Sequence, residues 1–127
     1  MEEYRLRNGT VYTVLAIGEE AVEESRLPVL EARVAGILRL GKRDEPFPYM
    51  NERLAAALRT SGPLAIQNGN AYVLTEKGRK FYYALIDLIY DVWGREVARK
   101  VMDVRKSNRS RRRKSEVLEQ EASQLTG

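Results

Sequence analysis

Residues 63–83 join a hairpin pattern to the start of a long helix, and no other segment restricts the fold as much. Two short β-type runs, 64–67 and 70–74, flank Asn68-Gly69, which favours a two-residue turn because both residues tolerate positive φ. A two-residue loop also fixes the register of the hairpin. Two cross-strand pairs then share one apolar face, which we expect to lie on the core: Ile66 with Ala71, and Leu64 with Val73.

A long helix is predicted directly after the hairpin. Thr75 can cap it, its apolar pattern continues at least to Trp93, and Gly94 is expected to kink or end it before residues 95–104. Its apolar side chains form two adjacent stripes that cover roughly 200° of the helix, about twice what a surface helix needs. We therefore expect the second stripe (Tyr82, Ile86, Tyr90, Trp93 and Val97), together with Ile89 of the first, to form a dimer interface.

The N-terminal part of the chain predicts two further helices. Asn8-Gly9 favours a turn, and the following apolar pattern fits a helix capped by Thr10 about as well as it fits a short strand; we favour the helix. The second helix carries Pro28 in its first turn and is expected to end at Gly41. Residues 42–48 contain two prolines and four charges, which indicates a connection.

A third helix is predicted over residues 48–60, ending at Ser61-Gly62. With Leu54 at the centre of its buried face, Met50 and Ala57 lie on the same side of the helix. Four polar or charged residues, Tyr49, Arg53, Arg59 and Thr60, then point away from the core.

The composition excludes several kinds of chemistry. The 127 residues include no cysteine and no histidine, which removes disulfides, thiolate nucleophiles, zinc sites of the usual kind and histidine acid–base catalysis. We therefore expect no enzyme activity, no catalytic residue, no cofactor and no metal. No apolar run reaches the roughly 18 residues of a membrane span, and the N-terminus lacks a secretory signal pattern, so a cytoplasmic protein without a membrane partner is expected.

The positive charge is concentrated in the C-terminal part. Residues 1–104 hold 15 Lys/Arg and 15 Asp/Glu, whereas residues 105–127 hold 7 and 3. We expect one folded domain over 1–104 and a basic, disordered tail over 105–127, which either binds a polyanion or only aids solubility. The cations of the tail are candidates for phosphate contacts: Arg105, Lys106, Arg109, Arg111, Arg112, Arg113 and Lys114.

The order helix, helix, helix, two-stranded wing, long helix resembles that of winged-helix transcription regulators. Within it, residues 70–79 (NAYVLTEKGR) resemble the second wing strand and the following helix start of the MarR and PadR families, and residues 28–93 fit the pattern. The resemblance implies a mainly α fold with a small β-hairpin: a winged helix-turn-helix with a long C-terminal dimerisation helix. It also implies a homodimeric, sequence-specific transcription regulator associated with the nucleoid.

The resemblance further implies that the third helix enters the major groove of double-stranded DNA. The residues of that helix that would contact DNA are Tyr49, Arg53, Arg59 and Thr60. Two other groups of residues would contact DNA, namely the wing tip (Asn68, Gly69 and Asn70) and the start of the long helix (Lys77, Arg79 and Lys80). The chain departs from the pattern in two places. Residues 42–48 are longer than a tight helix-turn-helix turn, and Glu52 faces outward on the third helix, where a carboxylate repels phosphate.

Two alternatives to a sequence-specific regulator stay open. The chain could be a nonspecific architectural DNA-binding protein that relies on its tail, or a winged-helix module that binds other proteins in a larger assembly. No residue pattern specifies an effector ligand.

Overall fold

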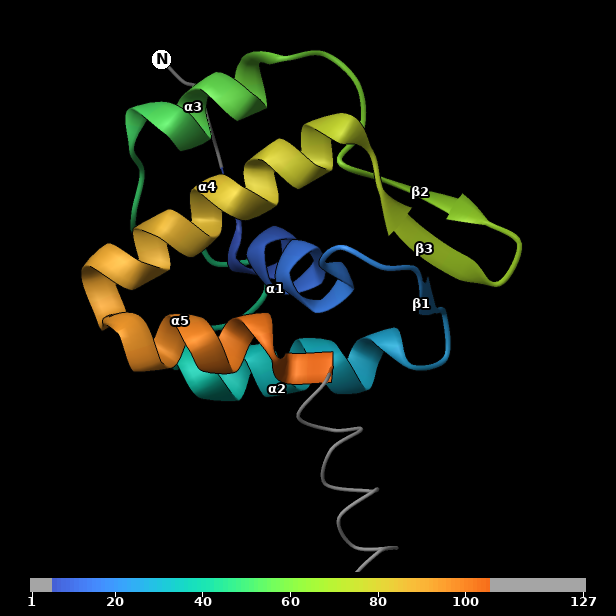
Figure 1. Ribbon diagram of the computed structural model, residues 1–127, viewed down its shortest axis with the longest axis horizontal. Helices are drawn as coiled ribbons and strands as arrows, with labels where there is room; N and C mark the ends of the chain where they lie inside the picture. Colours follow the sequence, from blue (N-terminus) through green and yellow to red (C-terminus); the bar gives the residue numbers. More distant parts are fainter. Residues whose placement is uncertain (1–5, 106–127) are drawn as a thin grey trace, which may run out of the picture.

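Five helices and a small antiparallel sheet make up residues 6–105, the part of the chain that this computed structural model describes (Figure 1). The elements in chain order are α1 (Asn8–Ile17), β1 (Val22–Glu23), α2 (Leu27–Leu38), α3 (Glu52–Arg59), β2 (Ala65–Asn68), β3 (Ala71–Leu74), α4 (Glu76–Trp93) and α5 (Arg95–Met102). This confirms the prediction of a mainly helical chain with a small hairpin. The short strand β1 was not predicted.

The helices pack in layers around α1 and α4. Helix α3 lies on one side of α4, and α1 lies on the other side, between α4 and the pair α2 and α5, which run side by side at the opposite end of the molecule (Figure 1). The largest fully buried side chains come from α1, α2, α3 and α4 and include Tyr12, Leu30, Leu54, Phe81 and Leu85. The hairpin of β2 and β3 projects from this helical body (Figure 1).

Helix α1 begins at Asn8, so the predicted Asn8-Gly9 turn is wrong, and Thr10 lies inside the first turn and is not the cap. The N-cap residue is Arg7, whose side chain makes no capping hydrogen bond. Contacts distant in sequence replace the cap. The backbone N–H groups of Asn8 and Gly9 donate to carbonyl groups of the α2–α3 connection, at 2.9 and 2.8 Å. These contacts satisfy donors that a helix start otherwise leaves unpaired.

The α2–α3 connection, residues 39–51, is held over its middle part against α1 and the residues just before α1. Asn8 is buried and its Nδ2 donates to the carbonyl of Lys42 at 3.1 Å, while the Tyr12 hydroxyl donates to the carbonyl of Gly41 at 2.8 Å. Near the end of the connection, the N–H of Phe47 donates to the carbonyl of Leu6 at 2.8 Å. The predicted connection therefore exists, and α1 fixes its path.

Helix α2 carries Pro28 in its first turn, as predicted, but it ends before Gly41. Its last residue is Leu38, and Arg39 follows in the left-handed conformation with φ 55°. The N–H of Arg39 closes the helix on the carbonyl of Ala35 at 2.8 Å. A residue in the left-handed conformation ends an α-helix. The helix therefore ends at Arg39 and not at Gly41, although glycine adopts this conformation more readily than arginine.

Helix α3 is shorter than the predicted 48–60. The Asn51 side chain caps it by accepting from the N–H of Leu54 at 2.8 Å, so the helix begins at Glu52 and the preceding residues belong to the connection. Leu54 is buried, as predicted, whereas Met50 lies outside the helix and is exposed. Helix α3 packs mainly on α4, so α2 and α3 do not form a tight helix-turn-helix pair.

The sheet has the strand order β1-β3-β2, and its turn lies one residue later than predicted. Gly69 and Asn70 form the two-residue turn, and only Gly69 has a positive φ, 64°, which fits a turn with glycine in the first central position. Ile66 therefore pairs with Val73 and not with Ala71.

The face of the hairpin that meets the core also differs from the prediction. Leu74 is buried, and Leu64, Ala65 and Tyr72 pack partly against the core, whereas Ile66 is 48% exposed. The base of the hairpin explains this register. The N–H of Thr75 donates to the carbonyl of Leu64 at 2.9 Å, so the hydrogen-bond ladder continues beyond the ends of the two strands. This bond fixes the register of the hairpin independently of the turn.

Candidate nucleic-acid interface

Thr75 and Gly78 fix the start of α4 to the start of the hairpin. The Thr75 Oγ1 caps α4, as predicted, by accepting from the N–H of Gly78 at 3.1 Å, and it donates to the carbonyl of Pro63 at 2.7 Å. A Cβ atom on Gly78 would lie 1.9 Å from the carbonyl oxygen of Leu64. Thr75 and Gly78 of the segment 70–79 are therefore accounted for by packing, and they fix the direction in which α4 begins.

Cations gather where α3 ends and α4 begins. The Lys77 Nζ donates to the carbonyl of Gly62 at 2.9 Å and so holds the segment after α3 against α4. Because the first turn of a helix carries partial positive charge, this end of α4 adds to the field of the cations around it. The other predicted cations here are exposed: Arg59, Arg79 and Lys80.

Two of the four contact residues predicted on the third helix make contacts within the chain. Tyr49 precedes α3 and packs edge-on against the rings of Phe47 and Trp93, with ring centroids 5.7 and 5.2 Å apart. The Arg53 guanidinium forms an ion pair with the Asp87 carboxylate of α4. Of the predicted set, the open end of α3 retains two exposed residues, Arg59 and Thr60.

The predicted wing-tip residues, Asn68, Gly69 and Asn70, are all exposed at the end of the hairpin. One side of the hairpin is tied to the segment after β1. The N–H of Glu24 donates to the carbonyl of Asn70 at 2.7 Å, and the Gln67 Nε2 donates to the Glu24 carboxylate at 3.0 Å. The hairpin itself contains no cation between residues 65 and 74.

The predicted dimer residues separate into a buried group and an accessible group. Tyr82 and Ile89 are 5% and 0% exposed, because α1 and α5 cover more of α4 than the sequence predicted. Trp93 is half-buried beside Tyr49, and Val97 lines a groove between α2 and α5. Tyr90, at 53% exposed, and the half-buried Ile86 are therefore the accessible members of the predicted set.

Tyr83 extends this accessible strip of α4 and was missed by the sequence reasoning. It is exposed and its hydroxyl donates to the Glu19 carboxylate. It lies seven residues before Tyr90, which places both on the same side of a helix. The seven-residue spacing could have indicated that Tyr83 lies beside Tyr90, but Tyr83 belongs to neither of the two predicted apolar stripes. Tyr83, Ile86 and Tyr90 are called the α4 strip below.

Arg105 belongs to the folded part of the chain and not only to the basic tail. Its guanidinium donates to the carbonyls of Glu20 and Ala21, each at 2.8 Å, and so joins the end of the helical body to the segment after α1. The remaining cations predicted in the tail lie outside the described residues: Lys106, Arg109, Arg111, Arg112, Arg113 and Lys114.

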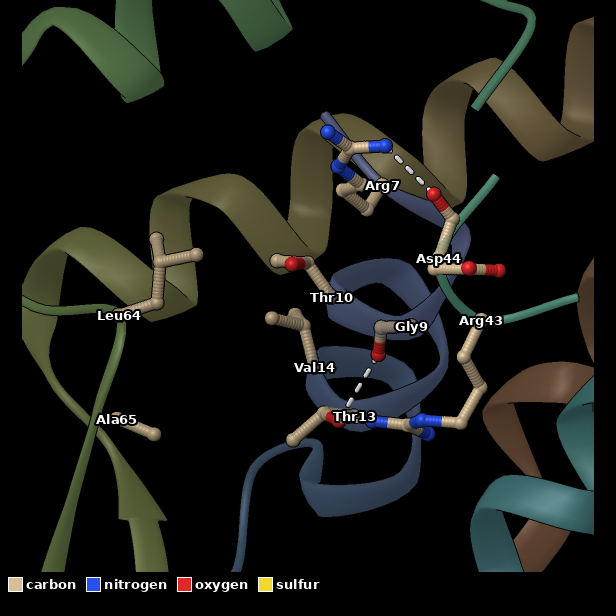
Figure 2. A pocket seen from close by; sticks show the side chains of 9 residues that line it. All are labelled: Arg7, Gly9, Thr10, Thr13, Val14, Arg43, Asp44, Leu64 and Ala65. Atoms are coloured by element: carbon tan, nitrogen blue, oxygen red, sulfur yellow. Dashed lines mark hydrogen bonds between the residues drawn. The ribbon is translucent and has the colours of Figure 1, made fainter. Parts of the chain in front are cut away.

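A groove of about 470 Å³ lies between the first half of α1, the start of β2 and the α2–α3 connection (Figure 2). Two arginines line it, and both have partners within the chain. The Arg7 guanidinium donates to the backbone carbonyl of Asp44 at 2.6 Å, and the Arg43 guanidinium lies 3.1 Å from the Glu31 carboxylate. The charges of this groove therefore hold the connection in place, and we do not assign them to the interface.

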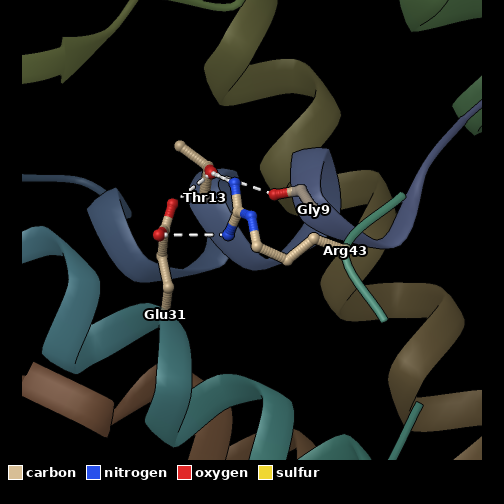
Figure 3. A network of polar contacts seen from close by, with 4 residues as sticks. All are labelled: Gly9, Thr13, Glu31 and Arg43. Atoms are coloured by element: carbon tan, nitrogen blue, oxygen red, sulfur yellow. Dashed lines mark hydrogen bonds and ion pairs between the residues drawn. The ribbon is translucent and has the colours of Figure 1, made fainter. Parts of the chain in front are cut away.

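Thr13 is the centre of a polar network that joins α1, α2 and the connection (Figure 3). Its hydroxyl donates to the carbonyl of Gly9 at 2.9 Å, accepts from Arg43 at 3.4 Å and contacts the Glu31 carboxylate. The network fixes the connection that leads into α3. The network therefore contributes to the candidate interface by positioning α3.

No protein-family model, curated protein or solved structure matches this chain. Within residues 6–105, no group of His, Cys, Asp and Glu side chains is placed to hold a metal ion. No helix in that part of the chain is long and apolar enough to cross a membrane.

Proposed function

We propose that the protein binds double-stranded DNA through α3 and the start of α4, and that it acts as a transcription regulator. The observation that carries the proposal is the group of exposed cations where α3 ends and α4 begins, beside a projecting hairpin (Figure 1). Phosphate oxygens are bound by such groups of Arg, Lys and helix N-termini.

The order of the elements supports a winged-helix arrangement. Helix α3 is followed directly in sequence by the hairpin, and β1 adds a third strand to it, so the helix and the wing lie on either side of the start of α4 (Figure 1). In this arrangement α3 would enter the major groove and the wing would lie along the backbone. The path of residues 39–51 departs from a tight helix-turn-helix, and α4 takes over the support of α3.

The charges favour phosphate contacts over contacts with bases. Arg79 and Lys80 are exposed at the start of α4, whereas Arg53 is already paired with Asp87. We therefore assign most of the binding energy to phosphate contacts. Sequence preference, in this proposal, comes from the end of α3, where Arg59 and Thr60 are exposed.

The α4 strip supports a homodimer. Its three residues lie on one side of α4, where Tyr83 and Tyr90 are exposed and Ile86 is half-buried. Aromatic side chains are enriched in the centres of protein interfaces because they bury a large area at a low cost in conformational entropy. A dimer formed through this strip would present two α3 helices to one duplex.

Fluorescence anisotropy of a labelled duplex tests the proposed interface. The full chain is compared with the double variant Arg79→Gln/Lys80→Gln and with Arg95→Gln/Arg99→Gln, which removes the same charge from α5. Losing two phosphate contacts should reduce the log–log salt slope by about 1.8, and the α5 variant should keep the slope of the unaltered chain. An equal reduction of the salt slope in both variants would show that only the net charge of the chain matters. That result would contradict the proposed interface.

Selection from a random duplex library separates a regulator from an architectural DNA-binding protein. A regulator enriches one sequence, and the enrichment survives removal of residues 106–127. Architectural binding enriches none and depends on the tail. If the full chain binds no duplex even at low salt, the proposal of DNA binding is wrong.

A further inference from the structure

Strand β2 presents an unpaired edge of the sheet. The strand order β1-β3-β2 places β2 at one side of the sheet, and among residues 6–105 no strand pairs with its outer edge. Ile66, Gln67 and Asn68 are exposed, and the hairpin that carries them projects from the helical body (Figure 1). The edge of a sheet offers N–H and C=O groups to which another strand can bind.

The pairing with β3 determines which backbone groups of β2 point outward. The N–H of Thr75 donates to the carbonyl of Leu64, and the register continues without interruption along the hairpin. In an antiparallel pair the hydrogen-bonded residues alternate along each strand, so every second residue from Leu64 onward directs its backbone groups toward β3. The N–H and C=O groups of Ala65 and Gln67 therefore point away from the sheet.

The outer edge of β2 lacks charge, proline and a bulge, three features that protect strand edges from other strands. Its residues, Ala65–Asn68, are all uncharged, and its register with β3 is continuous. The opposite edge of the sheet differs, because β1 ends at Glu23 and is followed by Glu24. Two copies of the chain would repel each other through the β1 edge, whereas the β2 edge sets no like charges against each other.

One register of two antiparallel β2 strands satisfies all the outward groups. When Ala65 of each copy faces Gln67 of the other, both pairs exchange N–H···O bonds, and Ile66 faces Ile66 on a twofold axis. Ile66 is 48% exposed in the single chain, and Val73, its partner on β3, lies on the same outer face. The edge is therefore complementary to itself in its backbone and in its apolar side chains.

The residues on either side of this segment end the pairing. The next outward positions are Pro63 and Gly69, which face each other in the same register. Pro63 has no N–H and its carbonyl accepts from the Thr75 hydroxyl, while the Gly69 carbonyl accepts from the Gln67 side chain. The carbonyls at both ends thus already have partners within the chain, and the unpaired segment is Ala65 to Gln67.

We propose that β2 pairs with β2 of a second copy in this register and joins the two sheets into one continuous sheet. Stable interfaces bury about 1,200–2,000 Å², and two strands of four residues bury less, so the association is weak and reversible. Such a contact becomes effective where copies are held close together. The inference concerns a different surface from the α4 strip and does not depend on DNA binding.

Disulfide cross-linking tests the register, because the chain contains no cysteine of its own. In the Ile66→Cys variant the two Cα atoms would lie about 4.5 Å apart, which a disulfide can span. Asn68→Cys is the matched control on the same exposed face, and its two Cα atoms would lie at least about 13 Å apart. Under mild oxidation the Ile66→Cys chain should form covalent dimers at least roughly tenfold faster. Equal rates, or a faster reaction of Asn68→Cys, would overturn the proposal.

A charge on the twofold axis tests the association itself. Ile66→Lys sets two ammonium groups against each other and should weaken the association at least roughly tenfold in sedimentation equilibrium. Ile66 and Val29 are 48% and 52% exposed, so neither Ile66→Lys nor Val29→Lys should lower the melting temperature, and Val29→Lys should keep the association. All variants carry Tyr90→Arg, so that a dimer through the α4 strip does not contribute. Equal association of the two lysine variants would leave the β2 edge to a strand of another protein and would overturn the proposal.

Discussion

The backbone carbonyl oxygen of Leu64 occupies the space that a side chain on Gly78 would need, 1.9 Å from the position of its Cβ. This close approach brings the first turn of α4 onto the start of the hairpin. Thr75 bonds to the same segment through the carbonyls of Pro63 and Leu64. The glycine is therefore required by packing at the point that joins the two parts of the proposed DNA-binding surface.

Gly78→Ala should destabilise the chain by about 2–3 kcal/mol, because a backbone carbonyl cannot rotate away as a flexible side chain can. Gly36→Ala is the matched control, since a Cβ there meets open space within a helix. The control should stabilise the chain by about 0.5–1 kcal/mol. Urea denaturation measures both, and equal effects of the two substitutions would contradict the packing argument.

Asn8→Ala should loosen the α2–α3 connection. The substitution removes the buried amide that donates to the Lys42 carbonyl, at a cost of about 1 kcal/mol. Trypsin should then cleave faster after Lys42 and Arg43. Asn68→Ala, at the exposed end of β2, is the chemically matched control and should leave the cleavage rate unchanged. A connection that stays equally resistant in both variants would show that Asn8 does not hold it.

Tyr82 should make the chain sensitive to alkaline pH. Burial, with smaller contributions from the Glu19 and Asp103 carboxylates, raises the pKa of Tyr82 to about 12, against 10.0 for an ordinary tyrosine. Between these values the folded chain keeps a proton that the unfolded chain has lost. The stability that Tyr82 contributes is therefore complete below pH 10 and falls as the pH rises toward 12, by about 1.4 kcal/mol per pH unit.

Denaturation curves between pH 8 and about pH 11.5 measure this slope. Tyr82→Phe should reduce it and should remove one late-titrating group from the tyrosinate absorbance. Burial also raises the pKa of Tyr12, with a further contribution from Glu45, so some slope should remain in the variant. An unchanged slope would assign the alkaline sensitivity to other groups.

Tyr90→Arg should convert the proposed dimer into monomers without unfolding the chain. The side chain is 53% exposed in the single chain, so the substitution costs little stability by itself, whereas a guanidinium buried in an interface without a partner is strongly unfavourable. Sedimentation velocity checks the oligomeric state. Val29→Arg, at an equally exposed apolar residue of α2, should leave the dimer intact. Dissociation in both variants, or in neither, would rule out the α4 strip as the interface.

The sequence predicts elements well where local signals and packing agree. Thr75 caps α4 and Gly94 ends it, as expected, and Pro28 lies in the first turn of α2. The buried face of α3 around Leu54 was predictable for the same reason, since helical spacing alone determines which side chains share a face.

The remaining features depend on contacts between distant segments. Asn8 and Gly9 favour a turn by themselves, but carbonyl groups more than thirty residues away bond their N–H groups and complete a helix start. The bond from Thr75 to Leu64 fixes the hairpin register, so the turn lies at Gly69-Asn70 and not at Asn68-Gly69. Strand β1 is two residues long, which is too short for an alternating pattern to reveal.

The predictions of site residues were also limited by contacts between segments that are distant in the sequence. Tyr49 was placed on a helix face that does not exist, because the Asn51 cap starts α3 later than the apolar pattern indicated. Arg53 is exposed, but its ion pair with Asp87 could not be predicted, because the sequence did not give the position of α4 relative to α3. At the start of α4, where Thr75 caps the helix, Arg79 and Lys80 are exposed, whereas Lys77 is half-buried and donates to the carbonyl of Gly62.

Helix α3 rests on α4, and residues 39–51 separate it from α2. In a dimer built on α4, the crossing angle between the two α4 helices would therefore set the distance between the two α3 helices. Any substitution that tilts one α4 against the other would change the half-site spacing that the protein selects on DNA. The geometry of the dimer and the spacing of the DNA half-sites that it selects would then evolve together. Helix α4 would connect the two although it touches no base.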